Sequence, residues 1–519
     1  MLVKTFAGAV HGVDAHTITI EVNIGGAVAN LDKPSYFIVG LPDSAVREGQ
    51  QRIDAALKNS HLRLGRFKTI INLAPADMRK EGSAFDLPIA IGMLAGASVI
   101  APDNLDRFFI MGELSLDGSL RPIKGALPIA IQAKREGMRG FILPKDNARE
   151  AAIVSGLEVY GVETLTQALE VLSGKSDLQP LVVNTREEFA NRLNAYDVDF
   201  SDVRGQENIK RALELAAAGG HNVILIGPPG AGKTMLARRL PTILPPLTLH
   251  EALETTKIHS VAGILGPDAA LVTTRPFRAP HHTISDVALV GGGSNPMPGE
   301  ISVAHNGVLF LDELPEFKRT VLEVMRQPME ERRITISRAK ISVDYPASFM
   351  LVASMNPCPC GYYNHPEKEC VCGPGIVKRY LSKISGPLLD RIDLHVEVTP
   401  VSYEELSSQE KPKETSDHLR ARVIRAREIQ AERFKTAKNI HCNAQMPSRM
   451  VRETCVLSPA GLNLLKTAME RLQLSARAYD RIIKVARTAA DLSGSADIRI
   501  EDLAEAINFR SLDREGWAG

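Results

Sequence analysis

Three stretches of the sequence carry residues suited to binding phosphate groups and a metal ion. The first is GPPGAGKT, which follows the apolar run NVILIG and matches the pattern G-x-x-x-x-G-K-[ST]. Glycines in such a loop let backbone N–H groups approach phosphates at the start of a helix. We expect Lys233 to reach the β- and γ-phosphates and Thr234 to bind Mg²⁺. The predicted phosphate loop comprises Gly227, Pro228, Pro229, Gly230, Ala231, Gly232, Lys233 and Thr234.

Two further apolar runs end in polar residues. In GVLFLDEL the apolar run VLFL is followed by Asp312 and Glu313, and FMLVASMN ends in Asn356. An acidic residue after such a strand holds Mg²⁺ in phosphate-loop enzymes, and a second carboxylate can polarise water for attack on the γ-phosphate. The amide of Asn356 could orient that water. Each motif alone could be an ordinary strand end, but together they predict a site for ATP and Mg²⁺.

A short segment, NPCPCGYYNHPEKECVCGPG (356–375), contains four of the six cysteines of the chain. Their spacing is C-x-C-x₉-C-x-C, which is tighter than the common zinc knuckle. Four thiolates from two turns could close a tetrahedral structural Zn²⁺ site, with His365 as a spare ligand. A plain thiol-bearing loop and redox or iron–sulfur chemistry are the alternatives. The predicted zinc ligands are Cys358, Cys360, Cys370 and Cys372.

Length and composition limit the classes of protein to which this chain can belong. A chain of 519 residues is too long for one core, and about three domains are expected. The net charge of +1 excludes a global basic field, so any contact with nucleic acid must be local. The longest apolar run, which starts at Leu87, is too short to span a bilayer and predicts a buried helix. With neither a signal-peptide core nor a disulfide framework, we expect a cytoplasmic protein with no membrane partner.

The chain divides into four parts by pattern. Residues 1–175 alternate strand-like and helix-like stretches, and 176–200 has the polarity of a linker. Residues 201–400 contain the three motif-bearing strands and predict an α/β core with the Cys-rich insertion at 358–372. Residues 401–519 are rich in charge and predict a helical domain.

The order of the phosphate loop, the Asp-Glu strand and the strand ending in asparagine resembles an AAA+ ATPase. GEISVAHNGVLFLDEL (299–314) is similar to the motor subunit of magnesium chelatase. SGPLLDRID (385–393) resembles the arginine-finger segment of that clade, which implies that Arg391 reaches the γ-phosphate of a neighbouring subunit. SARAYDRIIKVARTAADL (475–492) resembles the sensor-2 helix of the lid and implies a nucleotide-sensing role for Arg477. Without the resemblance, either arginine would be an ordinary surface helix residue; with it, the active form is expected to be a homo-hexameric ring.

The segment 112–147 resembles the proteolytic domain of Lon and the related domain of RadA. That resemblance implies an α+β fold of the ribosomal S5 domain 2 type. Lon uses a Ser–Lys dyad, but here Ser83 aligns only with a deletion and Lys124 is displaced by several residues. A serine without a nearby base is a weak nucleophile. We therefore expect no protease activity and a domain that docks DNA or stiffens the ring.

Residues 333–345, RITISRAKISVDY, alternate in polarity around an SRAK turn and predict a β-hairpin. In the related MCM-like AAA+ clade a hairpin at this place projects into the pore and its lysine grips DNA. The resemblance therefore points to Arg338 and Lys340 as contacts to DNA phosphates. A solvated hairpin tip without function is the alternative. No aromatic residue lies at the tip, which favours sequence-independent gripping of the backbone over base stacking.

The whole layout resembles the YifB-type, magnesium-chelatase-like AAA+ family. The resemblance implies an ATP-driven hexameric DNA helicase that promotes branch migration while DNA is integrated during natural transformation. Single-stranded or branched DNA and other recombination proteins are then the expected partners. The main alternative is a chelatase-like motor that remodels a protein partner, and a Lon-like protease comes third. Chelatase partners carry a D-x-S-x-S motif, but the DLSGS at 491–495 follows the sensor-2-like helix and is expected to be a helix-end loop.

Overall fold

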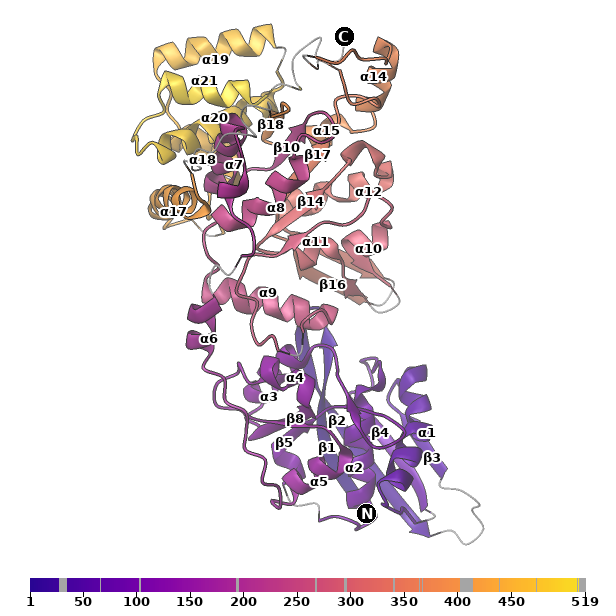
Figure 1. The fold of residues 1–519 in the computed structure, drawn as a ribbon. Coiled ribbons are helices and arrows are strands. Elements are labelled where there is room, and N and C mark those ends of the chain that lie inside the picture. The colour runs from indigo at the N-terminus through magenta and orange to yellow at the C-terminus, as the bar shows by residue number, and fades with distance from the viewer. Residues whose placement is uncertain are drawn as a thin grey trace. The chain divides into compact units, whose positions relative to one another are not determined.

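The computed structural model describes most of the chain. The described residues are 1–27, 35–65, 67–101, 104–192, 196–266, 268–293, 296–338, 341–363, 365, 367–401, 414–437, 439–472, 474–510 and 512. They form two compact units, one of residues 1–192 with 249–273 and one of residues 193–248 with 274–519 (Figure 1). The first boundary falls within the stretch 176–200, to which the sequence analysis assigned a linker.

The first unit is built on a seven-stranded mixed sheet with the order β3-β4-β2-β1-β5-β8-β9. Strand β1 pairs antiparallel with β2 over its full length, and β5, β8 and β9 run parallel to β1. The strands of this sheet are β1 (Leu2–His11), β2 (Asp14–Ala27), β3 (Ser35–Val39), β4 (Phe67–Ala74), β5 (Phe108–Ile110), β8 (Gly140–Pro144) and β9 (Glu158–Val162). Strands β6 (Glu113–Leu114) and β7 (Leu120–Arg121) pair with each other in a separate two-stranded sheet.

The first unit also contains helices. They are α1 (Ser44–Asn59), α2 (Asp86–Gly96), α3 (Ala126–Arg135), α4 (Lys145–Ala151), α5 (Leu165–Leu172), α6 (Thr185–Arg192) and α9 (Leu249–Ala262). Of these, α2 and α3 pack on β1 and β2, and α9 packs on α3. Every residue of α2 is buried, because this helix packs against β1 and β2 on one side and α1 on another. The apolar run from Leu87 is therefore a buried helix, as predicted from the sequence.

Helix α9 joins the first unit although its sequence lies between two strands of the second. Its Ser260 carbonyl accepts a hydrogen bond from the Gly125 N–H at 3.0 Å, and its hydroxyl accepts one from the Leu127 N–H at 3.4 Å. Lys257 forms an ion pair with Asp14 at 3.0 Å. The chain consequently passes between the two units three times, near residues 192, 248 and 273.

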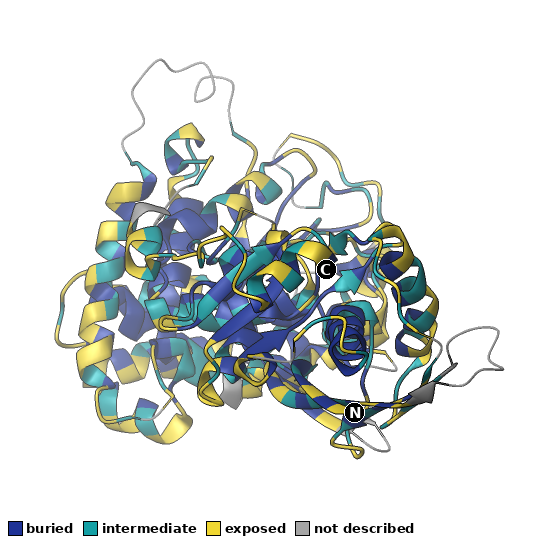
Figure 2. Ribbon diagram, turned by 90° about the horizontal axis from the view of Figure 1, so that it is seen from below, coloured by how far each residue is buried: buried dark blue, intermediate teal, exposed yellow. Residues whose placement is uncertain are grey.

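The second unit contains a five-stranded parallel sheet with the order β11-β14-β17-β10-β18. Its strands are β10 (Val223–Ile226), β11 (Phe277–Arg278), β14 (Val308–Leu311), β17 (Met350–Met355) and β18 (Leu394–Glu397). The three central strands are buried at every position, as expected for a sheet covered on both faces. The helices drawn at the outside of Figure 2 carry exposed residues, in yellow, as well as buried ones, in dark blue. Around it lie α7 (Glu207–Gly219), α8 (Lys233–Ile243), α10 (Asp286–Val290), α11 (Glu300–Val303), α12 (Arg319–Val324), α13 (Arg326–Glu331), α14 (Pro374–Leu381) and α15 (Gly386–Leu389).

The C-terminal part of this unit is helical in the described residues. It consists of α17 (Ser416–Arg433), α18 (Ser448–Thr454), α19 (Pro459–Arg471), α20 (Ala476–Leu492) and α21 (Ile500–Asn508). Apolar residues of these helices share one core with the parallel sheet. The fold class predicted from the sequence, a Lon-like α+β domain followed by an α/β core and a helical lid, is confirmed. None of the helices in the described part of the chain is long and apolar enough to cross a membrane.

Candidate nucleotide-binding site

The strand register of the parallel sheet brings the three sequence motifs to one edge. Ile226 lies opposite Met355, and Leu311 lies opposite Ala353. The residues that follow these strands therefore emerge side by side at the carboxyl edge, where open α/β sheets bind ligands. The phosphate loop, Asp312 and Asn356 meet there although up to 129 positions separate them in the sequence.

The phosphate loop has the backbone conformation that a phosphate cradle requires. Gly230 and Gly232 have φ angles of +79° and +82°, in the left-handed region that favours glycine. Helix α8 begins directly after Gly232 at Lys233, so its free N–H groups and its dipole face the loop. The residues present therefore fit the triphosphate of a nucleotide.

Lys233 lies folded into this loop. Its Nζ donates hydrogen bonds to the carbonyls of Gly227 (2.7 Å) and Pro228 (2.9 Å) and to Oδ1 of Asn356 (3.1 Å). Burial lowers the pKa of Lys233, and the negative charges of Asp312 and Glu313 partly oppose this shift. An arriving phosphate offers the ammonium group a better partner than the neutral carbonyls it now contacts.

Asp312 is positioned to share a magnesium ion with Thr234. The Thr234 hydroxyl donates to Oδ2 of Asp312 at 2.8 Å, and the Ser354 hydroxyl donates to Oδ1. A hydroxyl and a carboxylate at this separation are oxygen ligands of the kind Mg²⁺ prefers. Ser354 is not among the site residues predicted from the sequence. Its position opposite Asp312 follows from the register of β14 and β17 rather than from a local motif.

Glu313 follows Asp312 and has its side chain 56% exposed at the same edge of the sheet. Its φ angle is +54°, which is uncommon for a residue other than glycine and typical of functional positions. Oε2 of Glu313 lies 3.5 Å from Nδ1 of His282, a second residue that the sequence analysis did not single out. Glu313 is thus a solvent-accessible carboxylate next to the phosphate loop, suited to accept a proton from water.

Arg391 is held within its own chain. Its side chain is 10% exposed, forms an ion pair with Glu330 of α13 and donates from Nη1 to the Pro387 carbonyl at 2.5 Å. Its Nε is buried without a hydrogen-bond partner among the described residues. The backbone carbonyl of Arg391 accepts from Nδ2 of Asn222 at 3.0 Å, which ties the segment to the start of β10.

Helix α20 carries Arg477 in its first turn, but the side chain of Arg477 lies outside the described part of the structure. One turn further, Arg481 forms an ion pair with Asp393 at 2.7 Å. Burial acts against ionisation of Asp393, but Arg481 and His221 lower its pKa well below the ordinary value. This buried pair attaches the lid helix to the strand that follows Arg391.

The four cysteines of the Cys-rich loop come together. Their Sγ atoms all lie within 4.8 Å of one another, and Sγ of Cys358 lies 3.2 Å from that of Cys360 and 3.7 Å from that of Cys370. These separations are too long for a disulfide and close to the edge of about 3.8 Å of a tetrahedron with Zn–S bonds of 2.3 Å. Nδ1 of His365 is instead used by the backbone N–H groups of Glu367 and Lys368.

The Cys-rich loop also touches the phosphate loop. Gly361 has a φ angle of +85°, and a Cβ added there would lie 2.6 Å from the ring of Pro229. Only glycine permits both this conformation and this close approach. The loop that holds the cysteines therefore lies directly against the loop expected to hold phosphate.

The hairpin predicted at 333–345 is present as β15 (Arg333–Arg338) and β16 (Ile341–Pro346). Arg338 ends the first strand, but its side chain and all of Lys340 lie outside the described residues. In the first unit, the Ser83 hydroxyl donates to the carboxylate of Glu113. Lys124 packs instead against Gly263, so the two residues considered for a Ser–Lys dyad have different surroundings.

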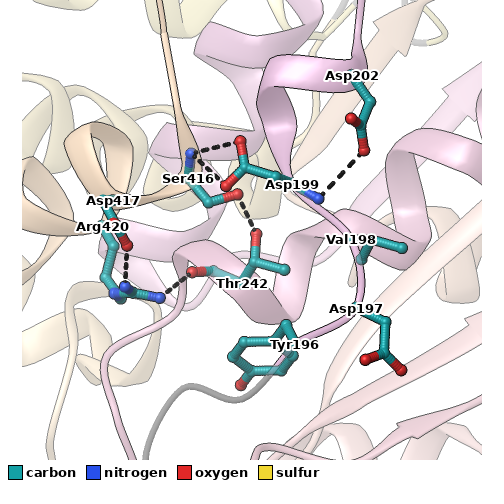
Figure 3. A pocket seen from close by; sticks show the side chains of 9 residues that line it. All are labelled: Tyr196, Asp197, Val198, Asp199, Asp202, Thr242, Ser416, Asp417 and Arg420. Carbon is teal, nitrogen blue, oxygen red and sulfur yellow. Dashed lines mark hydrogen bonds and ion pairs between the residues drawn. The ribbon is translucent and has the colours of Figure 1, made fainter.

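The described part of the second unit also contains a polar cavity of about 220 Å³ (Figure 3). Asp199 accepts hydrogen bonds from the N–H of Ser416, whose hydroxyl lies 2.7 Å from that of Thr242 (Figure 3). Thr242 lies nine residues after Lys233 on α8, roughly 14 Å along the helix. The cavity therefore lies at the end of α8 that is farther from the phosphate loop. The hydrogen bonds of Ser416 around it attach α17 to the rest of the unit.

The parallel sheet has the strand order β11-β14-β17-β10-β18, a phosphate loop follows β10, and an Asp-Glu pair follows β14. Together these features define an ATPase of the AAA+ class. Models of magnesium chelatase subunit ChlI match residues 199–406 and, for its C-terminal region, residues 413–510. A third model, also described as subunit ChlI of magnesium chelatase, matches residues 20–147.

Comparison with individual proteins extends this match to nearly the whole chain. The chain is 43% identical over 515 residues to competence protein ComM of Haemophilus influenzae, covering 99% of this chain and 98% of that protein. It is 42% identical over 506 residues to YifB of Escherichia coli, with 97% and 96% covered. Lon protease 2 of Bacillus subtilis is 31% identical over 157 residues, 28% of this chain and 27% of that protein. The chain therefore belongs to the magnesium-chelatase-like AAA+ family that includes ComM and YifB.

Proposed function

We propose that this protein is an ATP-driven, ring-forming DNA helicase of the cytoplasm that promotes branch migration while DNA is integrated during natural transformation. The observation that carries the proposal is the end-to-end similarity to a competence protein, at 43% identity, in a chain that brings Thr234, Asp312 and Glu313 to one edge of a parallel sheet. Competence concerns the uptake of DNA, so an ATPase of that class is expected to act on DNA.

In this proposal the residues of the sheet edge divide the work of ATP hydrolysis. The phosphate loop binds the triphosphate, and Thr234 and Asp312 hold Mg²⁺, which neutralises charge on the phosphates. Glu313 accepts the proton of the attacking water, and Asn356 orients that water. Arg477 is supplied by the lid and Arg391 by a neighbouring subunit. A single chain therefore lacks one of the arginines that contact the phosphates. A homo-hexamer is the assembly we propose.

Hydrolysis is coupled to DNA through the hairpin of β15 and β16. A ring repeats the two positive charges of Arg338 and Lys340 around one pore, which favours contact with the phosphate backbone rather than with bases. Such contact is independent of sequence and weakens with salt. The first unit is proposed to dock DNA or to stiffen the ring rather than to cleave peptides, since Ser83 contacts Glu113 rather than a lysine.

DNA-stimulated ATP hydrolysis tests this function. We expect forked or single-stranded DNA to raise the hydrolysis rate of the wild-type protein, and Lys340→Ala to reduce the ratio of the rates with and without DNA by about tenfold, because one lost phosphate contact per subunit is repeated around the ring. Lys378→Ala on α14, an exposed lysine away from the hairpin, is the matched control. ATP hydrolysis that is indifferent to every DNA would favour the alternative, a chelatase-like motor acting on a protein partner.

We further propose that Cys358, Cys360, Cys370 and Cys372 hold a structural zinc ion. The four sulfur atoms lie at separations close to those of a tetrahedral site, and Gly361 of the same loop packs on Pro229 of the phosphate loop. The segment connects Asn356 to the helices α14 and α15, which precede Arg391 along the chain. The proposed role of zinc is to brace this connection, and zinc takes no part in the reaction.

Removal of the zinc ligands should therefore disturb assembly and hydrolysis before it changes any preference for DNA. We expect purified wild-type protein to contain about one zinc per chain, and Cys358→Ser together with Cys370→Ser to lose it, with a lower melting temperature and a lower hydrolysis rate. Cys455→Ser, which lies outside the cluster, should keep the zinc. Metal analysis by mass spectrometry measures this directly, and wild-type protein free of zinc would contradict the assignment.

A further inference from the structure

His282 contacts the carboxylate to which the proposed function assigns proton transfer. Its Nδ1 lies 3.5 Å from Oε2 of Glu313, and its side chain is 31% exposed. An ionised carboxylate only accepts hydrogen bonds, so it favours the tautomer of His282 that is protonated at Nδ1. The described residues show no other side chain in ion-pair contact with Glu313.

The parallel pairing of β11 and β14 explains why this histidine is there. Phe277 lies opposite Val308, and Arg278 lies opposite Leu309. His282 lies four residues after the end of β11, in a turn closed by a hydrogen bond from the Ile284 N–H to the His281 carbonyl, and Glu313 lies two residues after the end of β14. The paired strands therefore lead both residues to the same edge of the sheet, where the contact is made between the segments that follow them.

The imidazole ring of His282 also has two aromatic neighbours. It lies against His281, with ring centroids 4.1 Å apart and the ring planes tilted by 34°, and meets the edge of Phe317 at 6.4 Å and 76°. Phe317 is buried, being only 4% exposed, and so provides a rigid wall. Packing against this wall restricts the rotation of the ring and therefore the directions in which Nδ1 can point.

Glu313 needs such a partner because its own side chain is mostly exposed. Its backbone is in the left-handed region, with φ at +54°, which turns the side chain out of the line of β14. A carboxylate that is free to rotate there spends part of its time away from any water at the phosphate loop. A fixed donor on one oxygen leaves the other oxygen pointing in a defined direction.

We propose that His282 is a positioning residue for ATP hydrolysis, which binds Oε2 of Glu313 and thereby orients the carboxylate toward the attacking water. This inference rests on the proposed function, since it assumes that Glu313 is the proton acceptor. His282 itself contacts neither phosphate nor metal in this assignment. It acts through Glu313 alone, and this restriction makes the inference testable.

The test is steady-state ATP hydrolysis by the full-length protein with His282→Ala and His282→Asn, alone and combined with Glu313→Gln. We expect His282→Ala to lower kcat by about 10- to 100-fold with KM changed less than about threefold, because a misdirected base slows chemistry without weakening binding. Asparagine places an amide N–H near the position of Nδ1, so His282→Asn should recover part of the rate. In the Glu313→Gln background, His282→Ala should have no further effect.

Each of the other outcomes would overturn either the proposed function or the proposed role of His282. A wild-type protein that hydrolyses no ATP, under conditions where it binds nucleotide, overturns the proposed function and this inference with it. Active wild-type protein with normal kcat in His282→Ala overturns the inference alone. A rise in KM with unchanged kcat, or an equal further loss in the Glu313→Gln background, would show that His282 binds nucleotide or supports the fold instead.

Discussion

Replacing Glu313 with glutamine is expected to reduce the rate of ATP hydrolysis by about 10²- to 10⁴-fold, the contribution of a well-placed general base. Glutamine has nearly the same shape as glutamate but cannot accept the proton of the attacking water. The phosphate loop, Thr234 and Asp312 remain in place, so the affinity for ATP should change less than about threefold. Steady-state phosphate release and the binding of a fluorescent ATP analogue measure the two quantities separately.

Glu316→Gln is the matched control for this substitution. Glu316 lies three residues further along the same turn, is exposed, and forms an ion pair with Lys383 at 3.1 Å. An exposed pair of this kind contributes little to stability, so Glu316→Gln should keep nearly the full rate. Glu313→Gln with more than a tenth of the wild-type rate would show that another group accepts the proton.

Replacing Arg391 with alanine is expected to lower hydrolysis by about 10³- to 10⁵-fold, the range for an arginine supplied to a transferring phosphoryl group. In the structure this arginine is tied to Glu330 and to the Pro387 carbonyl of its own chain. Its proposed role therefore requires that ring assembly exchange the Glu330 contact for the phosphate of the neighbouring subunit. Arg379→Ala on α14, an exposed arginine twelve residues earlier, is the matched control.

Mixing two inactive variants tests whether Arg391 acts between subunits. A site formed by an Arg391→Ala subunit beside a Glu313→Gln subunit has an intact Glu313 and receives an intact Arg391. With random mixing in equal amounts, about a quarter of the interfaces of a ring are of this kind. Hydrolysis should therefore return on mixing, to a level far above that of either variant. Absence of any recovery would show that Arg391 serves its own subunit or only the fold.

The phosphate loop, the Asp-Glu pair and Asn356 could be found in the sequence because each follows an apolar strand. The alternation of strand, loop and helix around GPPGAGKT is a local pattern, and the glycines at 230 and 232 are needed for a local backbone conformation. Parallel sheets bring such strand ends to one edge. Thr234 and Asp312 consequently lie within hydrogen-bond distance of each other, and their binding of Mg²⁺ stays a prediction.

Ser354 and His282 could not be found in this way. Each is identified by its contact with a residue that follows β14, Asp312 for Ser354 and Glu313 for His282. The register of β11, β14 and β17 depends on packing across the whole sheet, which no short stretch of sequence encodes. A serine two positions before Asn356 and a histidine pair after PFRAP are unremarkable until the strands are aligned.

Two other features arise from tertiary packing alone. Helix α9 packs with α3 of the first unit, although the residues on either side of segment 249–273 belong to the second. The burial of Arg391 against Glu330 could not be predicted from the sequence either. The resemblance to an arginine-finger segment implies instead that Arg391 is exposed at a subunit interface. In both cases the partner is far away in the sequence, so the contact follows from the fold and not from local propensity.

ATP-dependent branch migration of a synthetic four-way DNA junction tests the proposed function most directly. We expect the wild-type protein with ATP and Mg²⁺ to convert the junction into two duplexes, and Lys233→Ala, which lacks the phosphate-binding ammonium group, to leave it unchanged. A non-hydrolysable ATP analogue should support DNA binding but no conversion. ATP hydrolysis by the wild-type protein without any movement of DNA strands would contradict the proposed helicase function and would point to a motor that acts on a protein partner.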